Sequence, residues 1–287
     1  MDKYRLLREA VACELPAIAL LQPEAASDGV LALAHHPRYI YELTTGSLPV
    51  LAQKAIGFPW SPEMVERSRR SAGATICAAR AALIDGVSLN LAGGTHHAEF
   101  EAGGGYCCFN DIAVAARLMQ AEKRIKTALV IDLDVHQGNG TAQILRDDAS
   151  VFTFSMHGEK NYPFKKELSD LDVGLADGTG DEVYLNALDR ALQTIASLVT
   201  PDLIFFLAGA DVFEHDRLGT LALSKAGIAR RDAEVFEFAC TAYNKPVPVV
   251  VAMGGGYCPE ISDIVDIHLS TVKAAFQFYS TYKLTTR

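Results

Sequence analysis

Three short segments of the chain, residues 128–131, 203–207 and 247–252, are apolar at nearly every position. Strands buried on both faces of a parallel sheet have this pattern, because helices cover both sides of such a sheet. Residues 88–91 and 151–155 are shorter and more mixed candidates. We therefore expect a mainly parallel sheet.

Segments with the helical spacing of apolar residues alternate with these strands. They cover residues 62–83, 111–121, 181–198, 225–243 and about 259–282. Alternating strands and helices predict the α/β class, with a mainly parallel sheet flanked by helices. No internal repeat, low-complexity tract or linker divides the sequence, so residues 1–287 are predicted to form a single domain.

Polar residues that follow the strands carry most of the chemical information, because ligands bind outside the carboxyl ends of parallel strands. Asp132, Asp134 and His136 alternate directly after the apolar residues 128–131. Residues two apart point to one side of an extended chain. Two carboxylates and an imidazole brought together are costly unless a cation compensates them. The alternative is a hydrogen-bonded polar cap on the strand.

A second acid, Asp211, follows the apolar residues 203–207. By itself it would fit a helix N-cap or a turn. With Asp134 and His136 it completes a three-ligand set that leaves a position for water and substrate, as in catalytic zinc sites. Ligands rich in oxygen also admit iron, manganese or cobalt.

Two glycine-rich segments follow the remaining strands. His96 and His97 come after Gly93 and Gly94, which give the backbone room and bring two imidazoles near one site. A structural histidine pair is the alternative. The other segment is three glycines followed by Tyr257, where Gly255 and Gly256 are candidates to border a substrate and the phenol could point inward. The alternative there is a flexible turn with a packed tyrosine.

Composition restricts the possible partners. With 49% hydrophobic and 21% charged residues the chain is typical of globular proteins. Its net charge of −9 disfavours nucleic acid and anionic membranes as direct partners, but tolerates a cationic ligand such as a lysine peptide or a polyamine. Six cysteines without a C-x-x-C pair indicate reduced thiols. Because no signal peptide or membrane-spanning stretch is visible, we expect a cytoplasmic protein.

The four segments, in this order, resemble the histone deacetylase superfamily, including its bacterial acetylpolyamine and acetoin-utilisation relatives, from Lys3 to about His268. Residues 105–111 (GYCCFND), 155–157 (SMH) and 216–219 (DRLG) are also similar to family motifs. The spacing of residues 161–163 (NYP) and the run 178–185 look most like the class IV branch.

The resemblance implies an arginase/deacetylase fold and the zinc-dependent hydrolysis of an N-acyl amide, such as acyl-lysine in a peptide or protein, or a small acylated amine such as an acetylpolyamine. It implies that zinc, with Fe2+ as the alternative, binds to Asp134, His136 and Asp211. It further implies that His97 is the general base and acid, and that Tyr257 stabilises the oxyanion.

The remaining roles also come from the resemblance. His96 is the electrostatic companion of His97, Asp132 supports His96, and Asn139 lies behind His97 where many relatives have aspartate. Three residues match the family positions that form the walls of a narrow substrate tunnel: Gly105, Tyr106 and Leu218. Residues 36–61 should form a loop at the rim of this tunnel. A potassium site beside the zinc matches Asp132, Asp134, His136, Ser155 and Met156.

One departure and two alternatives accompany this interpretation. Family members usually carry a first strand and a His-x-Phe-Pro-type segment before the motif that here opens the chain at Met1, so on that comparison the leading segment is missing. A binuclear manganese ureohydrolase is disfavoured because Gly138 stands where a bridging aspartate would be needed. A deacetylase-like protein that binds or scaffolds with impaired turnover is the other alternative. The oligomeric state cannot be read from the sequence.

Overall fold

The structure, a computed structural model, describes residues 2–285 and is built around one sheet of six parallel strands. The strand order is β1-β6-β5-β2-β3-β4. The strands are β1 (Val87–Asn90), β2 (Ala128–Asp132), β3 (Val151–Gly158), β4 (Leu171–Leu175), β5 (Leu203–Leu207) and β6 (Val249–Ala252). This confirms the predicted α/β class with a parallel sheet.

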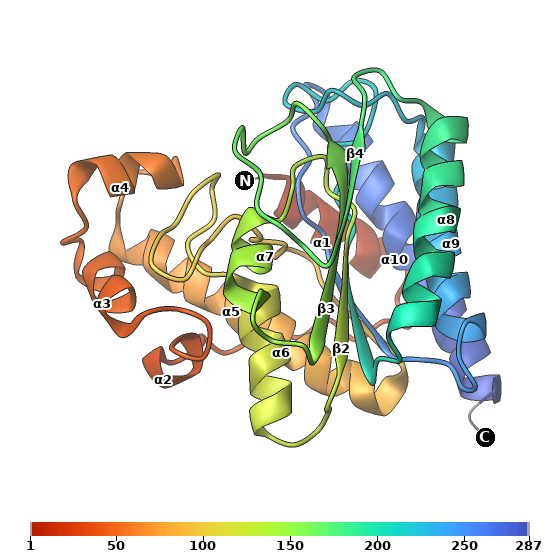
Figure 1. The fold of residues 1–287 in the computed structure, drawn as a ribbon, viewed down its shortest axis with the longest axis horizontal. Coiled ribbons are helices and arrows are strands. Elements are labelled where there is room, and N and C mark those ends of the chain that lie inside the picture. Colours follow the sequence, from red (N-terminus) through yellow and green to blue (C-terminus); the bar gives the residue numbers. More distant parts are fainter. Residues whose placement is uncertain (1, 286–287) are drawn as a thin grey trace.

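Helices cover both faces of the sheet (Figure 1). One layer contains α5 (Pro62–Asp85), α6 (Asp111–Ala121) and α7 (Asn139–Leu145). The opposite layer contains α8 (Asp181–Leu198), α9 (Lys225–Thr241) and α10 (Ile261–Thr285), and α1 (Asp2–Glu14) packs against α10.

Alternate residues of each central strand belong to different cores. On β2, Val130 joins the cluster under α5 and α6, whereas Ile131 joins the cluster under α8 and α9. Phe205 and Phe206 on β5 divide in the same way, and both are fully buried. Because both faces are covered, these strands contain almost no polar residue until they end. Polar side chains are thereby concentrated at the carboxyl edge of the sheet.

The helices begin where the sequence supplies a cap. Ser61 Oγ accepts a hydrogen bond from the Met64 N–H at the start of α5, and Pro62 occupies the first turn. Asn110 Oδ1 accepts from the Ala113 N–H at the start of α6. Such side chains satisfy amide groups that have no partner within the helix.

Some elements differ from expectation. Residues 36–61, expected to be a rim loop, contain α3 (Pro37–Thr45) and α4 (Val50–Ile56). The helices α1, α2 (Asp28–Leu31) and α7 and the strand β4 were not predicted either. The helices α2, α4 and α7 have at most seven residues, too few to establish a period, and β4 is half-exposed and lacks the fully apolar pattern. Among the described residues, no helix is both long and apolar enough to cross a membrane.

Candidate metal centre and active site

The four sequence motifs meet because they follow four adjacent strands. The histidine pair follows β1, the glycines and Tyr257 follow β6, Asp211 follows β5, and the segment with Asp134 and His136 follows β2. These strands are neighbours in the order β1-β6-β5-β2, and all are parallel. Their carboxyl ends therefore open on one site, as expected for ligand sites in parallel sheets.

Asp134, His136 and Asp211 form a compact group that could hold a metal ion. One ligand atom from each lies within 4.8 Å of the others. His136 Nδ1 is 2.9 Å from Asp134 Oδ1 and 3.3 Å from Asp211 Oδ2. All three side chains are buried or nearly so. Two oxygen ligands and one nitrogen ligand fit a catalytic zinc-type site, which leaves a position open.

The charges in this group fit a bound cation. Asp211 Oδ2 is buried and accepts no hydrogen bond from the described residues. Burial, together with the charge of Asp134, raises the pKa of Asp211 to about 7. Burial alone would lower the pKa of His136, but the neighbouring carboxylates of Asp134 and Asp211 raise that pKa to about 10. The cluster attracts positive charge, and a divalent ion among the ligand atoms would supply it.

The two adjacent histidines have different partners and different charges. His96 Nδ1 lies 2.6 Å from Asp132 Oδ2; burial opposes its protonation, but Asp132 and Asp134 raise the pKa of His96 to about 9. His97 Nδ1 lies 2.7 Å from Asn139 Oδ1. Burial and the positive charge on His96 hold the pKa of His97 well below its ordinary value. His97 is thus the neutral imidazole beside the metal ligands.

The glycine-rich turn after β6 brings Tyr257 to the same cavity. The Gly255 N–H donates to Asp134 Oδ2 at 2.8 Å, and the Tyr257 N–H donates to Asp216 Oδ2 at 2.6 Å. Burial and the nearby Asp211 and Asp134 charges raise the pKa of Tyr257, which keeps the phenol protonated as a hydrogen-bond donor. Lys3 Nζ donates to the Gly256 carbonyl and lies 5.3 Å from the ring centre of Tyr257.

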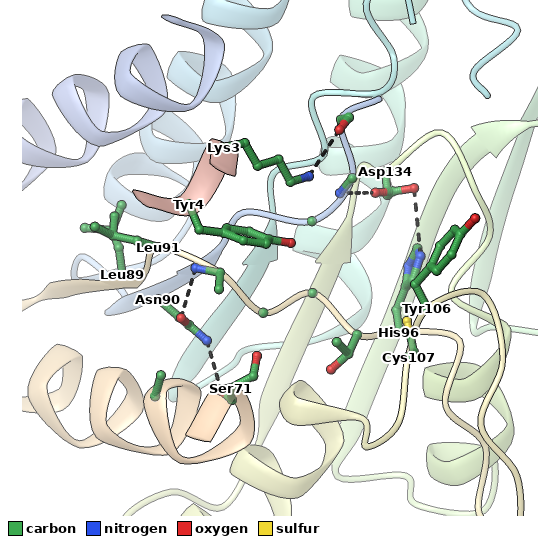
Figure 2. Close-up of a pocket in the computed structure, with 18 of the residues that line it drawn as sticks. Lys3, Tyr4, Ser71, Leu89, Asn90, Leu91, His96, Tyr106, Cys107 and Asp134 are labelled. Carbon is green, nitrogen blue, oxygen red and sulfur yellow. Dashed lines mark hydrogen bonds and ion pairs between the residues drawn. The ribbon is translucent and has the colours of Figure 1, made fainter. Parts of the chain in front are cut away.

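A cavity of about 1960 Å3 contains this site and extends past Lys3 and Tyr4 to the outer edge of β1 (Figure 2). The cavity is lined by the three residues predicted as tunnel walls, Gly105, Tyr106 and Leu218, and by Gly255 and Gly256.

Tyr162 also lines this cavity, and its ring makes an edge-on contact with that of His97 at 4.8 Å between ring centres. Its motif was noted in the sequence, but no role was inferred.

The residues matched to a potassium site are neighbours in the sheet. Ser155 on β3 is in register with Asp132 on β2, and Met156 follows it. Ser155 Oγ lies 2.9 Å from His157 Nδ1. The potassium site remains a prediction.

Sequence reasoning missed several residues that hold the site. Arg231 is fully buried on α9 and donates to the carbonyl oxygens of Leu133 and Gly209, at the ends of β2 and β5. Asp111 accepts from the N–H groups of Gly94 and Thr95 and shapes the turn before the histidines. Asp111 and the Tyr257 partner Asp216 lay within noted motifs without a role, whereas no sequence pattern distinguished Arg231.

Comparison with known proteins agrees with this geometry. The histone deacetylase domain family matches residues 2–272. An uncharacterized protein of Picosynechococcus sp. is 42% identical over 97% of this chain and 93% of its own length. Histone deacetylase 2 of Arabidopsis thaliana is 32% identical over 86% of this chain; the match covers 65% of that protein.

Solved structures share the fold. The crystal structure of the HDA15 HD domain has a TM-score of 0.79 at 22% identity and covers 98% of this chain and 85% of that one. A crystal structure of an HDAC homolog complexed with SAHA has a TM-score of 0.79 at 24% identity, with 94% and 77% covered. With the match of residues 2–272 and the Asp-His-Asp metal group at the carboxyl ends of the strands, the chain belongs to the histone deacetylase domain family.

Proposed function

We propose that this protein is a zinc-dependent hydrolase of N-acyl amides, acting on acyl-lysine in a peptide or protein or on a small acylated amine such as an acetylpolyamine. The observation that carries the proposal is the geometry of His97: its buried imidazole lies 2.7 Å from the Asn139 amide oxygen, and its ring centre is 5.7 Å from that of His136 in the Asp134, His136 and Asp211 group. A general base needs a free nitrogen within reach of the reacting water. An amidohydrolase site requires both features together.

The residues of the chain have distinct tasks in this reaction. A divalent ion held by Asp134, His136 and Asp211 would supply Lewis acidity, which polarises the amide carbonyl and lowers the pKa of water. His97 takes the proton of the attacking water and returns a proton to the departing amine. His96, kept charged by Asp132, adds positive charge beside the developing anion. Tyr257 donates a hydrogen bond to the carbonyl oxygen as it becomes negative.

Finer assignments accompany this proposal. We assign the chain to the class IV branch on its NYP spacing at residues 161–163 and on residues 178–185, and propose one catalytic domain over residues 1–287. A potassium ion at Asp132, Ser155 and Met156, which the family resemblance implies, would stabilise the end of β2. A binuclear ureohydrolase has no support, because Gly138 supplies no carboxylate for a second ion.

The first test is Tyr257→Phe. Loss of an oxyanion donor should lower kcat about a hundredfold or more, while zinc content and the free energy of unfolding stay close to the wild-type values. Tyr41→Phe is the control, because Tyr41 is an exposed tyrosine on α3. Turnover of an acetyl-lysine peptide and metal content by mass spectrometry are the readouts. Wild-type turnover in Tyr257→Phe would refute the role of Tyr257.

A panel from acetyl-lysine to myristoyl-lysine peptides, together with acetylpolyamines, identifies the substrate class. Turnover of at least one member is expected with one zinc ion per chain. A protein that binds zinc and a hydroxamate inhibitor but hydrolyses no member of the panel would instead support the binding or scaffold alternative. Two manganese ions per chain would favour a ureohydrolase.

A further inference from the structure

Glu99 lies behind the His97–Asn139 pair and is in hydrogen-bond contact with it. Asn139 Nδ2 donates to Glu99 Oε1 at 3.0 Å, while Asn139 Oδ1 lies 2.7 Å from His97 Nδ1. The other carboxylate oxygen accepts from Gln143 Nε2 at 3.2 Å. The three side chains of His97, Asn139 and Glu99 therefore form a continuous chain of hydrogen bonds that begins in the active site.

We propose that Glu99 is a positioning residue that fixes the orientation of the Asn139 amide, and through it the tautomer of His97. The proposal rests on the proposed function, in which His97 acts as a base. With the Asn139 oxygen facing Nδ1, His97 carries its proton there. The lone pair of Nε2 is then free for the cavity that His97 lines.

An asparagine alone cannot determine this tautomer. Its amide has an acceptor on one side and donors on the other, so it can pair with either form of a neutral imidazole. If the amide were rotated, Nδ2 would donate to Nδ1 of His97 and the imidazole proton would move to Nε2. His97 could then accept no proton from water. In serine proteases, the wrong tautomer caused by an aspartate-to-asparagine change lowers kcat by about 10⁴.

The carboxylate of Glu99 removes this ambiguity. A carboxylate only accepts hydrogen bonds, so it requires the Nδ2 side of the Asn139 amide. The rotated amide would place Asn139 Oδ1 against Glu99 Oε1, two acceptors about 3.0 Å apart. An aspartate behind a histidine accepts with either oxygen and needs no such partner. Glu99 thus fixes, through Asn139, the direction of the hydrogen bond to His97. An aspartate at position 139 would fix that direction by itself.

Glu99 is itself held in place. Its backbone N–H donates to the Ala102 carbonyl, and its own carbonyl lies 2.9 Å from His35 Nδ1. Gln143 cannot rotate its amide freely, because its Oε1 accepts from the Phe100 N–H at 3.0 Å. The Gln143 amide that donates to the Glu99 carboxylate is therefore itself oriented by a backbone group.

The first test replaces Glu99 and reads the tautomer of His97 directly. In the zinc-loaded protein with ¹⁵N-labelled histidine, the wild-type His97 should show a protonated Nδ1 and an unprotonated Nε2. Glu99→Leu should shift His97 toward the other tautomer. This readout does not depend on turnover, so it distinguishes failure of this inference from failure of the proposed function. A wild-type His97 protonated on Nε2, or an unchanged tautomer in Glu99→Leu, would overturn the proposal.

For activity, Glu99→Leu should lower kcat at least about tenfold, toward the loss expected for the wrong tautomer, with KM and zinc content nearly unchanged. Glu99→Gln keeps the shape of the side chain but must turn an NH2 group toward Asn139 or Gln143. It should show the same effect to a smaller extent, which keeps the test available if Glu99→Leu folds poorly. Glu101→Leu is the matched control in the same segment, because its side chain is mostly exposed.

The decisive experiment is a double-mutant cycle. Asn139→Asp alone should lower kcat, because two carboxylates would face each other at about 3.0 Å. Adding Glu99→Gln to Asn139→Asp should restore kcat, since the aspartate needs no orienting partner and the glutamine can donate to it. If the role of Glu99 is purely structural, Glu99→Gln should lower kcat by the same factor in the wild-type and Asn139→Asp proteins. Additive losses would therefore refute the inference, and rescue would support it.

Discussion

At the scale of single residues, the site depends on glycines, which carry no side chain. A Cβ atom on Gly255 would lie 1.8 Å from Asp211 Oδ2 and 2.8 Å from Asp134 Oδ2. The first distance is far below van der Waals contact, so the carboxylates or the turn would have to move. The third glycine, Gly256, adopts a positive φ of 143° that side chains rarely allow. Glycine is therefore required here by close approach and by conformation.

Gly255→Ala should displace the metal-binding carboxylates without unfolding the protein. A displacement of about 1 Å at reacting groups can cost about a hundredfold in rate. We expect a loss of kcat of that order and a weaker zinc affinity, measured by competition with a chelator. Gly29→Ala is the control, because among the described residues no atom outside its own helical turn lies within 4 Å of the added carbon. Full activity with wild-type zinc affinity in Gly255→Ala would contradict the described geometry.

At the scale of elements, α9 connects the ends of two strands that bear metal ligands. Arg231 donates to the Leu133 carbonyl at 3.2 Å and to the Gly209 carbonyl at 2.6 Å. Its Nε also donates to Asp232 at 2.9 Å, and both side chains are buried. The guanidinium thus spans the ends of β2 and β5, next to Asp134 and Asp211. Its rigid planar fork suits this bridge better than a flexible ammonium group would.

Arg231→Met should be strongly destabilising, because it leaves the buried Asp232 carboxylate without its cation and two carbonyls without donors. Breaking such a buried pair typically costs about 3–5 kcal/mol. Urea denaturation measures the change in the free energy of unfolding. The control is Arg230→Met on the same helix, where the side chain is 71% exposed and a change near zero is expected. Equal changes in the free energy of unfolding for the two substitutions would show that the Arg231 hydrogen bonds do not stabilise the fold.

At the scale of the whole molecule, a buried histidine links the segment before α3 to the segments after β1. His35 Nδ1 lies 2.9 Å from the Glu99 carbonyl, and His35 Nε2 accepts from the Asn110 N–H at 2.8 Å. Burial lowers the pKa of His35 to about 4, although its backbone hydrogen bonds oppose this. The neutral imidazole therefore holds together parts of the chain that are 64 and 75 residues apart.

This contact predicts acid sensitivity of the folded state. The pKa of His35 is about 6.5 when unfolded and about 4 when folded, so between these values the unfolded chain binds more protons. The contribution of the neutral His35 to the free energy of unfolding is complete above pH 6.5. It is lost as the pH falls toward 4, a difference of about 3 kcal/mol. His35→Gln, which can still donate and accept, should lose less stability between pH 7 and pH 4.5. Denaturation at both pH values tests this, with the neighbouring His36→Gln as control; identical losses in wild type and His35→Gln would refute it.

Much of the fold could be predicted because the signals are local. The five predicted strands and five predicted helices are all present, with ends that differ by a few residues. Burial on both faces imposes an apolar run on the central strands β2, β5 and β6. Short helices such as α2 and α4, and the half-exposed strand β4, lack such a signal. The helix α2 packs against α3 and α6, and β4 pairs with β3, so these elements depend on tertiary contacts rather than on an intrinsic pattern.

The candidate site, like the fold, could be predicted from the sequence only in part. The sequence by itself determined the candidate residues for the proposed reaction, because glycine, histidine and aspartate directly after apolar strands form recognisable motifs. Only the tertiary structure decided which of them meet: the order β1-β6-β5-β2 brings Asp211 to Asp134, 77 residues earlier in the chain. It also decided that Asn139 faces Glu99 and that Arg231 bridges two strand ends. Such contacts depend on side-chain direction between distant elements, which no local spacing encodes.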